Sequence, residues 1–541
     1  MKVLLVCPRF PESLWSFSGI TPLVGARTFE VPIGLATVAA LTPSDWQIRI
    51  VDENIEAIDF DVETDVVGIS LFNVQFRRAV EIAAEFRRRG RWVVAGGAYP
   101  TLRSDACAPH FDAVFEGEAE LTWPAFCRDF ARGVREPLYR QDDKIDITTS
   151  PPPRNDLMDA GAYVNFGIQT TRGCPFDCEF CDIIVTDGRR PRTKTVDQVM
   201  VEVESIRRAG GQYAVFTDAN LIADPRFARR LLTALRDWGR AHRFPLRFSA
   251  EVTLNVADMS DILDLLQQAN FESVFVGIES PRPASLTIAS KQVNLRGRGT
   301  LVDKIARIQA RNLIVIAGMI VGFDTDDHDI FEEQVRMLDE AGIPFTTSGV
   351  LVAIERTPLH ERLKAAGRLL EWDMTTTEGH GAADLNFTPK LMSAADLLAG
   401  YNWMIRRHYR YDTYRRRLVT ALARFERTRD PAMRSALRFD RRLLLRGLRI
   451  IVHYLTSGGA KRRFFLGTLG DIARTGLTGP KIVLGITFLA AHKHFHEFVT
   501  AVHGDPETVA GAIAWPDGRQ ADRRQVARPY SMRTADGLVT P

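Results

Sequence analysis

The chain has 541 residues, of which 45% are hydrophobic and 25% charged, and a formal net charge of +3. At roughly 150 residues per domain this length predicts three or four domains, and the composition excludes a fibrous or largely disordered protein. The run MKVLLVCPRFPE stops being apolar at Pro8 and has no small-residue cleavage site, so we expect a first β-strand rather than a secretory signal. Six cysteines, three of them within eight residues, are not typical of a secreted disulfide framework and predict a cytoplasmic protein.

Positive charge is concentrated towards the C-terminus. Residues 401–480 contain 19 Lys and Arg against 5 Asp and Glu, a local balance of +14, which leaves −11 for the remainder. Because these charges alternate with apolar and aromatic residues, the region indicates contact with anionic lipid, a phosphate-bearing ligand or nucleic acid. A solvated helical face explains the same pattern equally well.

Residues 1–135 alternate short apolar runs with helical patterns, from KVLLVCP through QIRIVDEN, VVGIS and RWVVAGG to AVFEGE. This alternation predicts an α/β domain with a doubly wound, Rossmann-like parallel sheet, whose ligand lies at the carboxyl ends of the strands. Residues 136–163 include SPPPRND, are poorly periodic, and predict an extended linker.

The alternation resumes at 164–390, with about six strand–helix repeats between FGIQTTRG and FTTSGVLVAI, which predict a partial or complete parallel (β/α)6 TIM-type barrel. Residues 391–502 are helical in pattern and basic. Their apolar run 483–491 is far shorter than the ~20 residues that span a bilayer, so we expect it at most on a membrane surface. Residues 503–541 are polar and predict a loose tail.

The run RGCPFDCEFCDI places Cys174, Cys178 and Cys181 after the first strand of the predicted barrel. Three thiolates at this spacing on one loop can ligate three irons of a four-iron, four-sulfur (4Fe–4S) cluster and leave the fourth iron without a protein ligand. A zinc site is the alternative, but zinc usually needs a fourth Cys or His at a recognisable spacing, and none follows closely. We therefore predict a 4Fe–4S cluster with one open iron.

Several further runs resemble radical S-adenosylmethionine (radical SAM) proteins with an N-terminal cobalamin-binding domain, and among these the hopanoid C-methylases. The runs are VGAR (24–27), GEAE (117–120), RGCPFDCEFCDIIVTDGRRPRTKT, GIESP, AGMIVGFDTD and NFTPK. The resemblance implies that the open iron chelates S-adenosylmethionine, which accepts one electron and releases a 5′-deoxyadenosyl radical. It also implies a cobalamin cofactor and an electron donor of the flavodoxin or ferredoxin type.

By the same resemblance, residues at later strand ends hold S-adenosylmethionine. They are Asp218 and Asn220 near the methionine amino group, Glu251 near the ribose, and Gly277, Glu279 and Gly322 near the adenosyl part. Carboxylates accept hydrogen bonds from ammonium groups and ribose hydroxyls, which suits these roles. A helix cap at Asp218 and a structural ion pair at Glu251 are the alternatives. Relatives tend to have a second acidic residue where this chain has Ala219.

In the first domain, the run VDEN stands where many cobalamin proteins have an Asp-x-His-x-x-Gly signature, and the histidine position is Asn54. Cobalt cannot take a histidine ligand from this position, so the resemblance implies cobalamin without a lower histidine. The other positions assigned to this cofactor are Gly68, Ser70, Gly96, Gly97 and Glu118. The glycines suit a corrin tail that passes close to the backbone, although a tight turn explains each one equally well.

Aromatic, histidine and cysteine residues elsewhere are less specific. The aromatic residues are Trp403, Tyr409, Tyr411 and Tyr414, the histidines His492, His494 and His496, and the cysteines Cys7, Cys107 and Cys127. The aromatic residues line an apolar channel, lie at a membrane surface, or pack helices together. We expect the histidines to be interfacial or solvated and the cysteines to be in the core.

These features together predict a cobalamin-dependent radical SAM C-methyltransferase that acts on an unactivated carbon of a hydrophobic, lipid-like or polycyclic, or natural-product substrate. The alternatives are a radical SAM enzyme that catalyses a rearrangement, oxidation or cyclisation without methyl transfer, and a cobalamin or metal sensor that binds nucleic acid. We expect no nucleic-acid partner, because a recognition-helix or RNA-binding signature is missing. The predicted location is the cytoplasm, with peripheral association at the inner face of the membrane.

Overall fold

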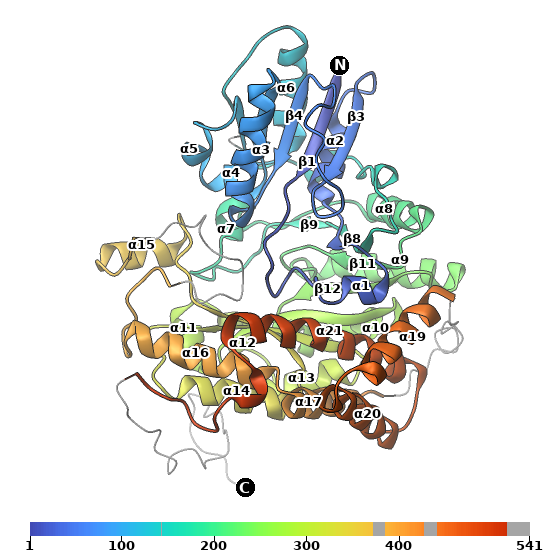
Figure 1. Cartoon of the computed structure of the whole chain (residues 1–541), viewed down its shortest axis with the longest axis vertical. Coiled ribbons are helices and arrows are strands. Elements are labelled where there is room, and N and C mark those ends of the chain that lie inside the picture. Colours follow the sequence, from blue (N-terminus) through green and yellow to red (C-terminus); the bar gives the residue numbers. More distant parts are fainter. Residues whose placement is uncertain (142, 372–384, 427–440, 517–541) are drawn as a thin grey trace.

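The computed structural model describes residues 1–141, 143–371, 385–426 and 441–516 and contains two parallel sheets, one above the other in Figure 1. The strands of the first sheet are β1 (Lys2–Cys7), β3 (Gln47–Asp52), β4 (Val66–Ser70), β5 (Trp92–Gly96), β6 (Ala113–Glu116) and β7 (Leu138–Arg140). They are all parallel and lie in the order β3-β1-β4-β5-β6-β7. The doubly wound sheet predicted from the sequence is confirmed.

Helices cover both faces of this sheet, because successive strand residues point to opposite sides. Leu4 and Val6 of β1 face α3 (Phe76–Arg88), α4 (Ala98–Leu102) and α5 (Ser104–Cys107). Val3 and Leu5 face α2 (Ile33–Leu41) and α6 (Ala119–Ala131). The cysteines expected in the core are all buried: Cys7, Cys107 and Cys127.

The carboxyl ends of β1 and β4 point towards the second sheet (Figure 1), and the chain order of the strands reverses between them. In sheets of this kind, ligands bind at such a reversal. β7 comes from the stretch predicted as a linker and adds an edge strand to the sheet.

The second sheet has seven parallel strands in the order β15-β14-β13-β12-β11-β8-β2. They are β2 (Thr28–Glu30), β8 (Tyr163–Ile168), β11 (Tyr213–Phe216), β12 (Arg247–Val252), β13 (Phe271–Glu279), β14 (Ile314–Val321) and β15 (Phe345–Val350). The helices between them include α8 (Val196–Ala209), α9 (Pro225–His242), α10 (Ser260–Gln268), α13 (Leu301–Gln309) and α14 (Ile330–Ala341). The six strands β8 and β11 to β15 form the predicted partial (β/α)6 barrel.

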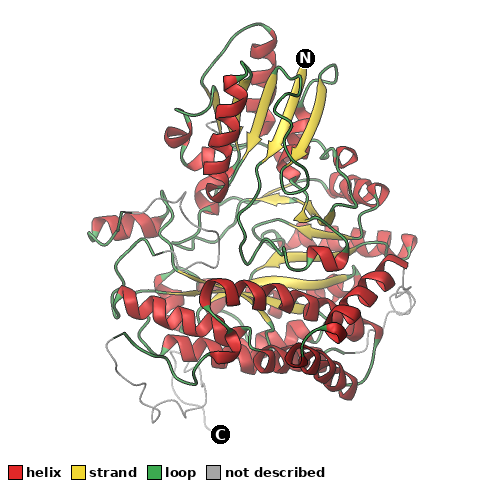
Figure 2. Cartoon of the chain, viewed as in Figure 1, coloured by secondary structure: helices red, strands yellow, loops and turns green. Residues whose placement is uncertain are grey.

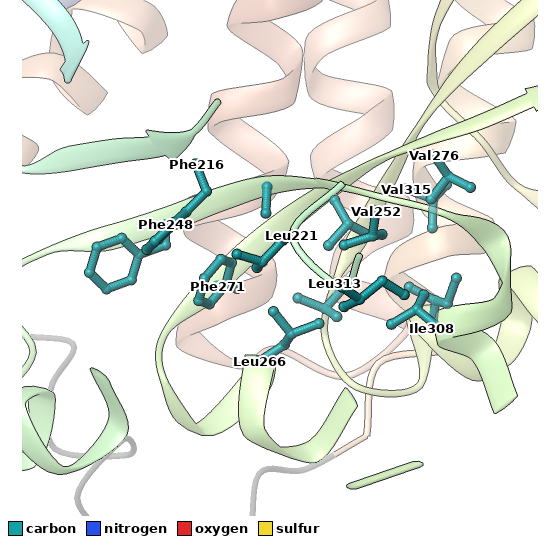
Figure 3. Packing of buried hydrophobic residues seen from close by; sticks show 14 of the residues in the cluster. Phe216, Leu221, Phe248, Val252, Leu266, Phe271, Val276, Ile308, Leu313 and Val315 are labelled. Carbon is teal, nitrogen blue, oxygen red and sulfur yellow. The ribbon is translucent and has the colours of Figure 1, made fainter. Parts of the chain in front are cut away.

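The outward faces of the barrel strands pack against these helices. Phe216 of β11 lies 5.6 Å from Phe248 and 5.4 Å from Phe271 between ring centres, within the cluster drawn in Figure 3. Ala250 and Val252 of β12 belong to the same cluster. Alternation therefore places Glu251, which lies between them, on the inner face of the barrel.

The segment that joins β1 to α2 leaves the first sheet and packs across the open side of the barrel. It includes α1 (Thr21–Val24) and β2, which pairs with the first barrel strand β8. Phe17 stacks on Phe29 of β2, with ring centres 4.0 Å apart, and lies edge-on to Phe345 of β15 at 6.1 Å and to Phe495 at 5.6 Å. Aromatic packing thus joins the two edge strands. The domain limits at 135 and 163 stay predictions.

The C-terminal region is helical, as predicted. Its long described helices are α16 (Ala394–His408), α17 (Tyr411–Ala423), α19 (Arg441–Thr456), α20 (Gly459–Arg474) and α21 (Gly479–His503), which lie in front of and below the barrel strands in Figure 2. Tyr409 and Tyr414 are buried and their hydroxyls donate to the Thr346 and Phe488 carbonyl oxygens, so they pack helices.

Two expectations for α21 are wrong. The apolar run 483–491 is packed inside the helical region, with Leu484, Phe488 and Leu489 buried, and so is not free to lie on a membrane. His492 and His494 are buried rather than solvated, because their ring nitrogens lie 2.8 Å from the Tyr409 carbonyl oxygen and 3.1 Å from that of Ser13. Within the described ranges, no helix is long and apolar enough to cross a bilayer. The loose tail predicted from residue 503 is wrong for its described part, because Val509, Ile513 and Trp515 are buried against the C-terminal helices. The rest of that tail, from residue 517 onward, lies outside the described ranges.

Candidate functional site

The three cysteines lie on the loop between two short antiparallel strands, β9 (Thr171–Arg172) and β10 (Arg192–Thr193). Gly173 has a φ of +89°, and a Cβ there would lie 2.6 Å from the Arg190 carbonyl oxygen, so glycine is required at this turn. Cys178 is buried, whereas Cys174 and Cys181 are partly buried and without disulfide bonds. The loop therefore presents three free thiols at the carboxyl end of the first barrel strand.

The surroundings of these thiols fit an iron–sulfur cluster. No three Cys, His, Asp or Glu side chains of the described residues converge on a point where one metal ion would be held. Zinc needs such convergence, whereas a 4Fe–4S cluster takes its thiolates on separate irons. Burial raises the pKa of all three thiols, that of Cys181 to about 12, so the thiolates need the positive charge that a cluster supplies.

A buried cation accompanies the cysteine loop. Lys291, which precedes α12 (Gln292–Leu295), has its Nζ 3.0 Å from Glu279 Oε1 and 5.9 Å from the centre of the Phe180 ring. Burial lowers the pKa of Lys291, but the charges of Glu279 and Cys178 raise it by more, so the ammonium group persists. A Cβ on Gly277 would lie 3.0 Å from Lys291 Nζ, so this glycine makes room for the ion pair. The sequence prediction did not include Lys291.

Asp218 and Asn220 lie after β11, where the sequence predicts them. Asp218 is fully buried, and its carboxylate accepts from the backbone N–H groups of Thr170 (2.6 Å) and Thr171 (2.8 Å) and from the Thr170 hydroxyl (2.5 Å). It therefore fixes the connection that leads to the cysteine loop. Asn220 is also buried, and its Nδ2 has no partner among the described residues, so this donor is available to a ligand.

Glu251 has a different environment. Its side chain is exposed and lies on the inner face of β12, so it meets solvent in the interior of the barrel. Burial, followed by the charges of Glu30 and Asp218, raises its pKa to about 7. It forms no ion pair with another described residue, and the predicted structural ion pair is therefore absent from the described part of the chain. Gly322 (φ +108°) donates its N–H to Asp326 Oδ2 at 2.9 Å and turns the chain after β14.

A buried cluster of charges links the first sheet to the cysteine loop. Arg172, two residues before Cys174, binds Glu118 at 2.9 Å and Glu120 at 2.7 Å, and Arg192 of β10 binds Glu118 at 2.9 Å. Glu118 was predicted at the cofactor, and in the structure its oxygens bind these arginines, the Gln141 amide and the Ile145 N–H. Burial raises the pKa of the Glu118 carboxyl, but the Arg172 guanidinium lowers it by more and holds this pKa below its usual value. The arginines, which the sequence prediction missed, flank the cysteine run.

Two glycines predicted at the cobalamin site, Gly97 and Gly68, have different surroundings. Gly97 (φ +107°) approaches β4 closely, since a Cβ there would lie 2.9 Å from the Leu71 carbonyl oxygen and 3.1 Å from Ser70 Oγ, at the carboxyl edge of the sheet. In contrast, Gly68 is buried against Leu5 and Trp123, which is a packing role.

Gly96 and Asn54 were also predicted at the cobalamin site. Gly96 has room for a side chain, with the nearest contact of an added Cβ at 3.7 Å. Asn54 binds its neighbours, because its Nδ2 donates to Asp52 Oδ1 at 2.6 Å and its Oδ1 accepts from the Phe10 N–H at 2.9 Å. Exposed Phe10 and Phe72 lie at the same edge with ring centres 6.0 Å apart.

An open parallel barrel with three free thiols on the loop after its first strand defines an iron–sulfur enzyme of the barrel type. The model of the radical SAM superfamily matches residues 168–338, and that of a domain of unknown function (DUF4070) matches residues 357–508. An uncharacterized methyltransferase of Synechocystis is 37% identical, over 69% of this chain and 70% of that protein. The hopanoid C-2 methylase of Rhodopseudomonas palustris is 33% identical, over 69% and 72%.

The chain belongs to the radical SAM superfamily, and it is an enzyme with methyltransferases among its relatives. The cofactors of this superfamily are a 4Fe–4S cluster and S-adenosylmethionine, as the sequence predicts. The fold agrees with a solved structure of the radical S-adenosylmethionine methyltransferase TsrM of Kitasatospora setae with cobalamin and a cluster bound. That structure has a TM-score of 0.60 at 16% identity and covers 88% of this chain and 98% of its own.

Proposed function

We propose that this enzyme is a cobalamin-dependent C-methyltransferase. The observation that carries the proposal is the buried charge cluster of Arg172, Glu118 and Glu120, which ties the carboxyl edge of the first sheet to the cysteine loop. A cofactor held at this edge would lie on the side of the first sheet that faces the cysteine loop. The names of the relatives, a methyltransferase and a methylase, support transfer of a methyl group.

Several residues at the edge suit cobalamin. Phe10 and Phe72 offer exposed ring faces to a flat macrocycle, and Gly97 lets a ligand approach the backbone beside Ser70. Cobalamin is named in the solved structure that shares this fold. Because Asn54 stands at the histidine position and is hydrogen-bonded to Asp52, the chain supplies no lower ligand from there.

The protein positions the cofactors and keeps water out, while the cofactors supply the radical and the methyl group. Cys174, Cys178 and Cys181 would hold three irons, and Lys291 would balance the negative charge of their thiolates. We expect a flavodoxin- or ferredoxin-type donor to deliver the electron. Inside the barrel, Phe275 contacts Trp15, with ring centres 6.1 Å apart, and this apolar wall supports a hydrophobic, lipid-like or polycyclic substrate.

The test is anaerobic purification with added cobalamin, followed by absorption spectroscopy and comparison of host extracts with and without the gene. We expect bound corrin and a product that is heavier by one methylene group in the presence of the gene. A protein that binds no corrin overturns the proposal. A product that has lost hydrogen or oxygen instead supports the alternative, a rearrangement or oxidation without methyl transfer.

We further propose that α19 holds the enzyme at an anionic membrane surface. One face of this helix exposes Leu445 (47%), Leu448 (56%), Val452 (48%) and Leu455 (42%) at helical spacing. Arg449 on the same helix is exposed, as are Arg462 and Arg463 near the start of the next helix, α20, and all three are positively charged. Apolar residues flanked by arginines suit the interface of an anionic bilayer.

Co-sedimentation with vesicles tests this surface. We expect the protein to bind phosphatidylglycerol vesicles at low salt, to bind phosphatidylcholine vesicles weakly, and to lose binding in the Leu448→Glu/Val452→Glu variant. Leu121→Glu, at an exposed leucine of the first domain, is the control and should bind like the native protein. Equal binding by the native protein and the α19 variant contradicts the proposal, as does a native dimer that only the variant dissociates.

A further inference from the structure

Two histidines of the C-terminal helices have ring nitrogens without a partner. Helix α20 packs against α19 and α21 (Figure 1). The Nε2 atoms of His453 on α19 and His496 on α21 are buried and have no hydrogen-bond partner among the described residues. His496 Nε2 lies 3.7 Å from Glu507 Oε1, which is too long for a hydrogen bond. Because buried polar atoms are normally paired, two such nitrogens in one place indicate a site for water or a ligand.

Two lysines accompany these imidazoles. Lys461 and Lys493 line the same small space as His453 and His496. Lys493 Nζ is 2.6 Å and Lys461 Nζ 3.5 Å from the oxygens of Glu497, so two positive charges share one negative charge. Burial and then the charges of Lys493 and Lys461 lower the pKa of His453. The space therefore combines an excess of positive charge with imidazole nitrogens that can donate.

The first turn of α20 adds positive charge. The helix begins after Gly458, and this turn contains Lys461 but no acidic residue and no side-chain cap. Arg462 and Arg463 follow directly and are exposed, and their guanidinium groups form no hydrogen bond or ion pair with another described residue. The N-terminal end of a helix favours anions and disfavours cations. Three successive cations at this end therefore oppose the helix dipole unless an anion binds beside them.

A hollow of about 350 Å³ lies beside Lys461 and His496. One water molecule needs only about 10–15 Å³ of such space, so the hollow admits a phosphate group and the part of a ligand attached to it. Its lining also contains two acids, Glu497 and Asp505. Both have partners within the chain, because Glu497 binds the lysines and Asp505 accepts from the Glu507 N–H at 2.9 Å.

We propose that Lys461, Lys493, His453 and His496 form a site that binds the phosphate group of a ligand. The several oxygens of a phosphate accept hydrogen bonds from ammonium and imidazole donors and from the first turn of a helix. The ligand is a soluble phosphate ester or the headgroup of a phospholipid. The site goes beyond methyl transfer, and only its lipid source rests on the membrane contact proposed for α19.

Isothermal titration calorimetry of the full chain with glycerol phosphate tests the site, and glycerol is the matched compound without the phosphate. We expect glycerol phosphate to bind and glycerol not to bind. Lys461→Gln/Arg462→Gln should weaken the binding of glycerol phosphate roughly tenfold, because it removes two positive charges. Arg207→Gln/Arg208→Gln, in the last turn of α8, removes the same charge elsewhere and should bind like the native protein.

Melting temperature is measured for each variant, and Arg462→Gln alone is used if the double variant does not fold. No binding of glycerol phosphate by the native protein overturns the site. Equal affinities of the native protein and the α20 variant overturn it as well, as does an equal loss of affinity in the α8 control.

Vesicles distinguish the two sources of phosphate. Phosphatidylcholine vesicles are made anionic with phosphatidic acid or, at equal surface charge, with oleic acid. A preference for phosphatidic acid that the α20 variant abolishes assigns the site to a lipid headgroup, whereas no preference assigns it to a soluble ester. The Leu448→Glu/Val452→Glu variant should lose vesicle binding and still bind glycerol phosphate, so failure of the membrane contact is distinguishable from failure of this site.

Discussion

Among single residues, a cysteine of the loop and a cysteine of the core should respond differently to the same substitution. Cys178→Ala removes one of three cluster ligands, so we expect loss of iron, of visible absorbance and of reductive formation of 5′-deoxyadenosine. Cys127→Ala removes a buried side chain of α6 and should lower stability while iron and activity remain. Retention of 5′-deoxyadenosine formation in Cys178→Ala contradicts the assignment.

Arg172 is the residue on which attachment of the cysteine loop depends. Arg172→Met leaves Glu118 and Glu120 buried without a full counter-charge, so we expect the free energy of unfolding in urea to fall by about 3–5 kcal/mol. Iron incorporation should fall as well, because Arg172 is two residues from Cys174. Arg154→Met breaks an exposed pair with Asp156 and should cost less than about 1 kcal/mol. Equal effects of the two substitutions argue against a buried attachment.

Among the elements, β2 and the segment before it join the edges of the barrel. Phe17, with a φ of +49°, is held by packing against β2, β15 and α21. Phe17→Ala should therefore destabilise the protein by about 3–5 kcal/mol in urea unfolding. Leu138→Ala, in the exposed edge strand β7, is the comparison and should cost under about 1 kcal/mol. A small effect at Phe17 would show that the barrel is stable without this contact.

For the whole molecule, the interior carboxylates predict how stability varies with pH. The pKa values of Glu30 and Glu251 are raised from 4.5 to about 7, so the folded state binds more protons than the unfolded state. Their contribution is fully present below pH 4.5 and is lost as the pH rises through about 7. The Glu30→Gln/Glu251→Gln variant should lose less stability over this interval, measured by melting temperature. Identical pH profiles of native protein and variant contradict the raised values.

Local patterns predicted much of this molecule. The strands β1, β4 and β5 follow from short apolar runs between turns, and the cysteine loop follows from the spacing of Cys174, Cys178 and Cys181. Local patterns gave the wrong location for the run 483–491, because its apolar residues pack against neighbouring helices and not against lipid. They failed for His494 for a related reason, since its carbonyl partners Ser13 and Leu14 are far away in the chain.

By itself, the sequence determined the two parallel sheets, the helical C-terminal region and the cluster motif, because periodicity and spacing are properties of neighbouring residues. Only the tertiary structure decided which side chains bind other residues of the chain and which remain accessible to ligands. It pairs Glu118 with Arg172, leaves Glu251 without an ion pair among the described residues and brings the Glu30 carboxylate over Gly167 of β8. These relations depend on burial and charge between distant segments, and no local pattern of residues encodes them.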